Sequence, residues 1–353
     1  MKHKLKLFLR NAYARVLFHT GLHAVVNGIM PRRWTILAGH CVGGRPGPND
    51  VLAPDMVISG PKLERILRWF ARRYDVVTVQ EGAQRMAAGG KKSLLSLSMD
   101  DGYRDNVEAL LPLCREVGVP ATVYLESRPL DERRVNWTHK FFWILTQMDP
   151  EAFVLRFTEL SDHEATNIEL NQLVPEGRAN AYHIKRLLKY EVPAEARRAA
   201  LDALFQELGG DERALCDSLY MDWDGARALR DAGHEVGGHT VNHEILSRLD
   251  DSALASELTG CEEALSRELG LSGVTFAYPF GRRWDYDDKA REAVRRSGFT
   301  HAVTTHAGTN DGRTDVTELK RLMIDDDAQL HLLVCEACGG FDLLRRLGLN
   351  WSE

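Results

Sequence analysis

The segment KSLLSLSMDDGYRDN, residues 92–106, joins a largely apolar run to two adjacent carboxylates and a glycine. Such a run, with no continuous polar face, is typical of a strand buried on both sides of a parallel sheet. Asp100 and Asp101 end the run, and Gly102 permits a sharp turn. Adjacent side chains at a strand end point in different directions, so one carboxylate can hold a metal ion while the other accepts a proton from water. An acidic pair before glycine is also a common turn or helix cap, and this segment alone leaves both interpretations open.

Similar apolar segments recur along the chain and alternate with helical stretches. Helices are predicted at 106–118, 252–270 and 288–298, where apolar residues are three and four apart and the stretch ends at glycine. This alternation indicates an α/β fold with a parallel sheet, and several apolar segments end in Asp or His, as in barrels whose strand ends build the active site. The predicted strands are at 34–40, 75–79, 92–100, 120–126, 234–240, 275–281 and 301–305.

The length of 353 residues fits one barrel of about 250 residues with an insertion and terminal extensions. We place the barrel at 34–330, between an N-terminal extension at 1–33 and a C-terminal helical tail at 331–353. The interval at about 128–220 is longer than a usual crossover helix, so we predict a helical insertion there that covers the site or docks a partner. The formal net charge of -6 argues against a nucleic-acid partner, because such proteins carry a basic domain or stripe.

The N-terminal extension is basic and amphipathic. No Asp or Glu occurs before Asp50, whereas eight Lys and Arg residues lie in that stretch among leucine, valine and phenylalanine. The pattern predicts a helix that rests on an anionic membrane surface, and a terminal helix packed on the barrel with a solvated basic face fits it equally well. No apolar run is long enough for a secretory signal or a membrane span, so we expect a cytoplasmic protein with peripheral membrane contact through residues 1–33.

A second polar cluster, GHEVGGHTVNHEIL, places His239 and His243 four residues apart. On a helix this spacing stacks two imidazoles on one face, and in a turn after a strand it can converge them on one ion. Two imidazoles and one carboxylate leave positions for water and substrate, as in catalytic rather than structural divalent sites. Such pairs also arise by chance in a chain with 13 histidines, but the upstream carboxylates favour a metal site.

Four motifs in order resemble the polysaccharide deacetylase superfamily, also called the NodB-homology group or carbohydrate esterase family 4. They are KSLLSLSMDDGYRDN, VGVPATVYLE, GHEVGGHTVNHEIL and FAYPFG. The resemblance implies a distorted (β/α) barrel that hydrolyses N-acetyl groups of amino sugars. It also implies one divalent ion, most commonly Zn²⁺ with Co²⁺, Ni²⁺ or Fe²⁺ as alternatives. At the matching positions, Asp101, His239 and His243 are the expected metal ligands and Asp100 is the expected general base.

The same resemblance implies groups around the substrate. The backbone N–H of Tyr103 is expected to hold the oxyanion, and Tyr278, Pro279 and Phe280 are expected to wall the sugar pocket. Aromatic residues at strand ends also serve as packing residues. The implied substrate is an N-acylated amino sugar in a polysaccharide, an oligosaccharide or a lipid-linked glycan.

The sequence departs from the family pattern in its general acid. No C-terminal strand ends in the His-Asp pair that usually supplies it. The segment ILAGHCV resembles an element of the circularly permuted subgroup that is similar to poly-N-acetylglucosamine deacetylases, which makes His40 the candidate acid. Gly39 replaces the usual tyrosine there, and a strand-end histidine that only forms hydrogen bonds is the alternative.

A second departure concerns the charge that orients the base. Ala277 stands where many family members have an arginine. The segment LKRLMIDD is similar to a subgroup segment with a fixed arginine, so Arg321 is the candidate replacement. The two departures also favour an alternative function, a catalytically silent carbohydrate-binding or assembly protein on the same fold.

Overall fold

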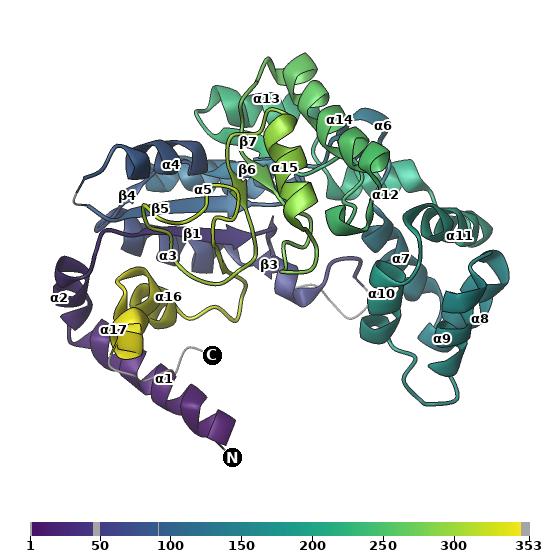
Figure 1. Cartoon of the computed structure of the whole chain (residues 1–353), viewed down its shortest axis with the longest axis horizontal. Coiled ribbons are helices and arrows are strands. Elements are labelled where there is room, and N and C mark those ends of the chain that lie inside the picture. Colours follow the sequence, from purple (N-terminus) through teal and green to yellow (C-terminus); the bar gives the residue numbers. More distant parts are fainter. Residues whose placement is uncertain (1, 45–49, 91, 347–353) are drawn as a thin grey trace.

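The computed structural model describes residues 2–44, 50–90 and 92–346, and a curled parallel sheet lies at its centre (Figure 1). Its strands follow the order β10-β1-β5-β6-β7-β8-β9, and β4 pairs with the start of β5. The strands are β1 (Trp34–Gly39), β4 (Asp75–Val76), β5 (Leu94–Met99), β6 (Thr122–Leu125), β7 (Glu235–Gly238), β8 (Phe276–Ala277), β9 (Ala302–Val303) and β10 (Leu322–Met323). Each predicted strand segment contains one of these shorter strands.

The sheet closes on itself where β9 and the residues after it pair with the segment that leads into β10. A parallel bridge joins Val303 of β9 to Leu319, just before β10, and the N–H of Thr304 donates to the carbonyl of Leu319 at 2.8 Å. Because the strands all run in one direction, their carboxyl ends meet at one end of this incomplete barrel. The predicted distorted (β/α) barrel is therefore confirmed.

The sequence patterns missed three short strands. β10 has only two residues, neither of them fully buried, and the apolar run to which they belong, 322–324, is three residues long between charged residues. The other two, β2 (Cys41–Val42) and β3 (Val57–Ile58), pair with each other beside the barrel. The two-residue strands β4, β8 and β9 were predicted because each lies within a longer segment rich in apolar and β-branched residues, whereas these three lie in shorter stretches between polar or glycine residues.

Residues of β5 alternate between the two faces of the sheet. Leu95 and Leu97 pack under the outer helices, in the core that surrounds the barrel. Leu94 instead belongs to a small cluster inside the barrel, and Ser98 donates to the carbonyl of Leu37 at 3.1 Å. This period of two directs Asp100, the next residue in the even-numbered series, towards the barrel interior.

Helices cover the outside of the sheet and end where the sequence predicts. The stretch at 106–118 begins as a π-helical turn and ends at Gly118, whose φ of 76° is left-handed, and Gly270 ends a second helix with a φ of 64°. The covering helices are α3 (Gly60–Ala71), α4 (Val79–Ala87), η2 (Asn106–Leu110), α5 (Leu111–Val117), α13 (Trp223–Asp231), α14 (Asp251–Leu269) and α15 (Asp288–Arg296). Two 3-10 turns, η1 (Pro54–Met56) and η3 (Leu246–Arg248), lie in the loops.

The long interval between β6 and β7 folds into a helical lobe beside the barrel (Figure 1). Its helices are α6 (Ser127–Glu132), α7 (Trp137–Gln147), α8 (Pro150–Leu160), α9 (Glu164–Gln172), α10 (Ala181–Tyr190), α11 (Ala194–Glu207) and α12 (Glu212–Leu219). Phe141, Phe153 and Leu201 are fully buried in the hydrophobic core of this lobe. A buried ion pair between Arg197 of α11 and Glu244 fastens the lobe to the loop after β7.

The two ends of the chain pack together below the barrel. α1 (Lys2–His19) and α2 (Leu22–Ile29) precede the first strand, while α16 (Leu330–Ala337) and α17 (Gly340–Arg346) follow the last one. Ala14 and Leu17 of α1 are buried against Cys335 and Phe341. Within the described ranges, no helix is long and apolar enough to cross a membrane. Residues 347–353 of the predicted C-terminal tail lie outside the described residues.

Candidate active site

A sharp turn after β5 separates the two adjacent carboxylates. Asp101 and Gly102 both adopt left-handed backbone conformations, with φ of 73° and 75°. The chain therefore reverses immediately, and the side chains of Asp100 and Asp101 point to different partners. Glycine is required at position 102, because a Cβ atom there would lie 2.7 Å from the Leu125 side chain.

Asp101, His239 and His243 form a buried cluster of three ligand atoms that all lie within 4.8 Å of one another. Nε2 of His239 is 3.1 Å and Nε2 of His243 is 3.5 Å from Oδ1 of Asp101. The carbonyl of Ala277 accepts a hydrogen bond of 2.7 Å from Nδ1 of His239, which leaves the Nε2 lone pair directed at the carboxylate. Oδ1 of Asp101 is buried without a hydrogen-bond donor in suitable geometry. Lone pairs and a carboxylate that face one another fit a divalent cation between them.

The backbone around this cluster is strained. Five non-glycine residues within the described ranges have positive φ, and four of them are Asp101 (73°), Thr240 (68°), His243 (56°) and Phe280 (60°). A left-handed conformation costs a non-glycine residue about 1–2 kcal/mol. Such strain persists where the surrounding structure enforces it, which is characteristic of functional sites.

The two histidines converge in a loop rather than on a helix. His239 follows the end of β7, and the backbone N–H of His243 donates to Oγ1 of Thr240 at 3.0 Å. Buried Glu257 of α14 accepts from the backbone N–H groups of Val241 and Asn242 at 3.0 and 2.8 Å. These bonds hold the loop in the conformation that brings both imidazoles to Asp101.

Arg321 lies against Asp100 inside the barrel. The guanidinium donates to both carboxylate oxygens at 2.7 Å, and its Nε donates to the carbonyl of Thr304 at 2.8 Å. Burial by itself raises the pKa of a carboxyl group, but the charge and hydrogen bonds of Arg321 outweigh this and hold the pKa of Asp100 below its ordinary value. A guanidinium from the segment before β10 thus occupies the interior next to Asp100, while Ala277 contributes only its carbonyl oxygen.

His40 and the N–H of Tyr103 face the same end of the barrel. His40 follows β1 and is half-buried. Burial raises the pKa of Asp101, but the hydrogen bond from His239 and the neighbouring imidazoles outweigh this and hold that pKa well below its ordinary value. Tyr103 faces Tyr220 in an antiparallel bridge, but the hydrogen bonds of this bridge are made by the neighbouring residues. The N–H of Arg104 donates to the carbonyl of Leu219, and the N–H of Met221 donates to the carbonyl of Gly102. The N–H of Tyr103 therefore has no acceptor in the described part of the chain. This amide is therefore free to donate to a ligand.

Phe280 lies over the cluster of Asp101, His239 and His243. Its ring meets the His243 ring edge to face at 4.6 Å between centroids and lies 6.3 Å from Trp137 of the helical lobe. Nζ of Lys189 is 3.5 Å from the centre of the Phe280 ring and 3.0 Å from Asp285. The lobe therefore reaches the cluster through Phe280, where the sequence predicts a pocket wall.

Tyr278 does not reach the site as expected. Its ring stacks on Tyr286 at 4.3 Å, within the core under the outer helices, and only 1% of its surface is exposed. Alternation along β8 and the residues after it explains this, because Ala277 faces the barrel interior and the next residue faces outwards. Pro279, the next residue, is also buried.

A buried polar network behind Asp101 was not foreseen from the sequence. Tyr103 Oη and His139 Nε2 are 2.8 Å apart, and Nδ1 of His139 lies 2.9 Å from the hydroxyl of Tyr220. Asn136 bonds to the same Nδ1 at 3.0 Å and donates to Glu126 at 2.9 Å. Burial lowers the pKa of His139 to about 4, so the ring is neutral. No local motif marks these lobe residues, because only the packed fold brings them to Tyr103.

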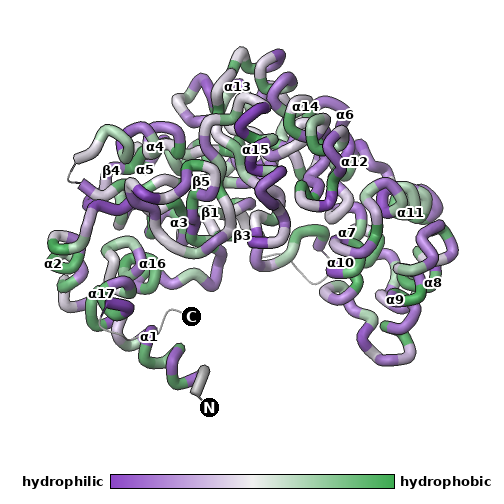
Figure 2. The backbone as a smooth tube through the Cα atoms, in the orientation of Figure 1, coloured by the Kyte–Doolittle hydropathy of each residue, from purple (hydrophilic) through white to green (hydrophobic). Residues whose placement is uncertain are grey.

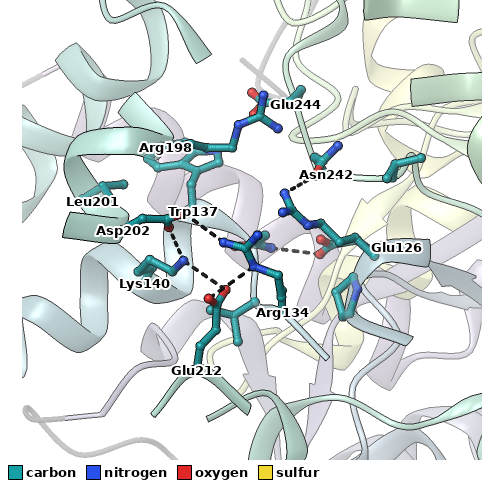
Figure 3. A pocket seen from close by; sticks show the side chains of 15 residues that line it. Glu126, Arg134, Trp137, Lys140, Arg198, Leu201, Asp202, Glu212, Asn242 and Glu244 are labelled. Atoms are coloured by element: carbon teal, nitrogen blue, oxygen red, sulfur yellow. Dashed lines mark hydrogen bonds and ion pairs between the residues drawn. The ribbon is translucent and has the colours of Figure 1, made fainter. Parts of the chain in front are cut away.

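A narrow cavity next to this network separates the lobe from the barrel (Figure 3). Its charged side chains are largely engaged with one another. Lys140 pairs with Glu212 at 2.9 Å, and Arg134 pairs with Asp202 at 2.9 Å and with Glu212 at 3.3 Å. These pairs fasten α7, α11 and α12 together beside the active-site network.

The fold and the clustered side chains define a parallel barrel enzyme whose site is built from acidic and imidazole groups at strand ends. A family model described as Polysaccharide deacetylase matches residues 87–302, more than half of the chain. The chain belongs to the polysaccharide deacetylase family, and this membership supports carbohydrate deacetylation as its activity.

Solved structures share the fold. The Streptococcus pyogenes deacetylase PplD, solved with acetate, is 14% identical with a TM-score of 0.57, and the match covers 87% of this chain and 99% of that one. A de-N-acetylase from Aggregatibacter actinomycetemcomitans is 16% identical with a TM-score of 0.52, and the match covers 84% of this chain and 97% of that one.

Curated relatives match only short segments. Chitin deacetylase 1 of Cryptococcus neoformans is 31% identical over 85 residues, which are 24% of this chain and 17% of that protein.

Proposed function

We propose that this protein is a divalent-metal-dependent hydrolase that removes N-acetyl groups from amino sugars. The observation that carries the proposal is the buried convergence of Asp101, His239 and His243 beside Asp100, which Arg321 keeps ionised. The ligand set of one carboxylate and two imidazoles suits a catalytic ion, and zinc is the ion we propose. Such an ion polarises an acetamide carbonyl and makes water more acidic when both are bound to it.

Asp100 serves as the general base in this proposal. It accepts a proton from the water that attacks the acetamide carbonyl carbon, and its depressed pKa keeps it ionised and ready to do so. Arg321 fixes the orientation of both carboxylate oxygens, each of which retains a further lone pair. The role that arginine has in many family members is thus assigned here to a residue from a different segment of the chain.

Tyr103 and His40 complete the proposed reaction. The free N–H of Tyr103 donates to the oxygen that becomes negative as the tetrahedral intermediate forms. His40 then gives a proton to the nitrogen as the C–N bond breaks, and the products are acetate and the free amino sugar. The neutral His139 holds the Tyr103 side chain, which keeps the backbone of this turn in place.

The proposed substrate is an N-acetylated amino sugar within a polysaccharide, an oligosaccharide or a lipid-linked glycan. Phe280 is only partly buried and offers an apolar surface next to the cluster, which suits the apolar face of a sugar ring. The test is to incubate metal-loaded protein with chito-oligomers and with nucleotide- or lipid-linked N-acetylhexosamines, and to follow the loss of acetyl by mass spectrometry. Failure to release acetate from any of them, with metal bound, would favour the silent carbohydrate-binding alternative.

Two variants separate the proposed base from a metal ligand. Asp100→Asn should lower turnover by about 10²–10⁴-fold while the metal content stays at the wild-type level, because the residue is not a ligand. His239→Ala should lose both metal and activity. Full activity in either variant would refute the corresponding assignment.

A further inference from the structure

The first helix, α1, is apolar on two opposite faces. Its inner face packs on α16 and α17 through Ala14 and Leu17, which are 0% and 6% exposed. Its outer face carries Leu5, Phe8 and Val16, which are 57%, 68% and 55% exposed. Intervals of three and eight residues place these three side chains on one stripe of a helix. The inner packing therefore leaves a second apolar stripe uncovered.

α2 repeats this arrangement. Val26 and Met30 are buried at 6% and 7% exposure, whereas Leu22, Val25 and Ile29 are 47%, 59% and 67% exposed. The exposed residues are three and four apart and again share one side of the helix. In Figure 2, both helices show hydrophobic segments at the margin of the molecule, and in Figure 1 the first turns of α1 extend away from the barrel.

Exposed apolar side chains are concentrated in this part of the described chain. The large hydrophobic residues that are exposed number thirteen, and seven of them lie between residues 5 and 29. Isolated exposed apolar residues are normal on a protein surface, but a contiguous group points to a binding surface. The remaining six are spread over the helical lobe, the loops and β10.

The charge of this surface identifies its partner. Lys4, Lys6 and Arg15 are exposed on α1, and no carboxylate occurs in the sequence before Asp50. Arg15 lies one position from Val16, and Lys4 one position from Leu5, so the cations flank the apolar stripe. Two copies of the surface would repel each other, whereas an anionic bilayer offers both negative headgroups and an apolar layer beneath them.

We propose that α1 and α2 form a membrane-docking surface, in which the two apolar stripes insert at the headgroup boundary of an anionic bilayer and the basic residues contact its headgroups. The helices lie in the plane of the membrane surface and do not cross it. This inference is independent of the reaction at the barrel. It assigns the protein a peripheral attachment that leaves the opposite, inner faces of both helices in the core.

The test is co-sedimentation of the full-length protein with vesicles of phosphatidylcholine alone and of phosphatidylcholine mixed with phosphatidylglycerol. Binding is expected only to the anionic vesicles and should weaken as salt increases. The double variant Phe8→Ser/Ile29→Ser should lose at least about tenfold in affinity for the anionic vesicles, because two large apolar side chains leave the interface. The matched control Leu155→Ser/Ile168→Ser removes side chains of similar exposure from the helical lobe and should bind as the wild type does.

Four results would overturn the proposal. Equal binding to neutral vesicles, or equal losses in the test and control variants, would show that the surface does not recognise an anionic bilayer. Absence of binding by the wild type would do the same. A dimer in light scattering that becomes a monomer in Phe8→Ser/Ile29→Ser, without vesicle binding, would assign the surface to a second copy of the chain. Thermal melting of each variant checks that the fold is intact.

Discussion

Replacing Arg321 with methionine would leave the carboxylate of Asp100 buried without its counter-charge. The guanidinium is completely buried, and it makes both of its 2.7 Å bonds to a carboxylate that is only 3% exposed. Removing one partner of such a pair costs about 3–5 kcal/mol of folding free energy, because the remaining charge is stranded in the interior. We therefore expect Arg321→Met to be less stable than the wild type by that amount near neutral pH.

The same substitution should change the pH dependence of turnover. The pKa of Asp100 is lower in the folded wild type than in the unfolded chain. Ionised Asp100 therefore stabilises the fold at pH values above the ordinary carboxyl pKa, and this stabilisation is lost as the pH falls through the lowered pKa of the folded state. Without Arg321, burial dominates and the pKa of Asp100 rises. Since the base must be ionised, the acid limb of the kcat profile should move to higher pH, with activity partly recovered in alkaline buffer.

The assays are urea unfolding and acetate release measured across the pH range. Arg321→Lys is the control, because it keeps the charge but loses the two-pronged geometry, and it should fall between the wild type and Arg321→Met. The double variant Asp100→Asn/Arg321→Met should recover part of the lost stability, since no buried charge is left. The reasoning is refuted if Arg321→Met keeps the wild-type acid limb and loses less than about 1 kcal/mol of stability.

Other outcomes follow from the same structure. Chelation should abolish acetate release and added zinc should restore it, whereas Asp101→Asn should stay inactive and metal-poor by elemental analysis. Gly237→Ala should destabilise the fold by about 1–3 kcal/mol in urea unfolding, because the new Cβ would lie 2.6 Å from the Thr275 carbonyl oxygen. Gly28→Ala is the control and should not destabilise the fold, because a Cβ at that position would have no atom within 4 Å. His40→Gln should slow amide hydrolysis by about 100-fold but spare an activated aryl acetate, whose leaving group needs no proton. Equal losses on both substrates would remove His40 from the role of acid.

The local parts of the fold could be predicted because local interactions specify them. The apolar run of β5 is buried on both faces, so its composition alone indicates a parallel strand. Gly118 and Gly270 mark helix ends because each adopts a left-handed conformation that other residues avoid. β10 was missed because its local sequence does not specify a strand; its two residues form one only by pairing with β1.

The candidate site divides in the same way. Strand-end chemistry and spacing pointed to one of the two adjacent carboxylates with His239 and His243, the family resemblance singled out Asp101, and the structure brings Asp101 and the two histidines together in one cluster. Tyr278 was expected at the sugar pocket, but the side-chain alternation of β8 directs it outwards to Tyr286. The error came from treating a motif as a unit when successive residues in it face opposite sides of the sheet.

The sequence by itself determined the class of fold, the four motifs and the amphipathic basic character of the first helix. Only the tertiary structure decided which cation neutralises Asp100, because Arg321 is 221 positions away in the chain and reaches it through closure of the barrel. It also decided that His139 of the lobe supports Tyr103, and which apolar faces of α1 and α2 stay uncovered. Local pattern specifies the elements, whereas contacts between distant segments depend on how those elements pack, and it is these contacts that set the charge and geometry of the site.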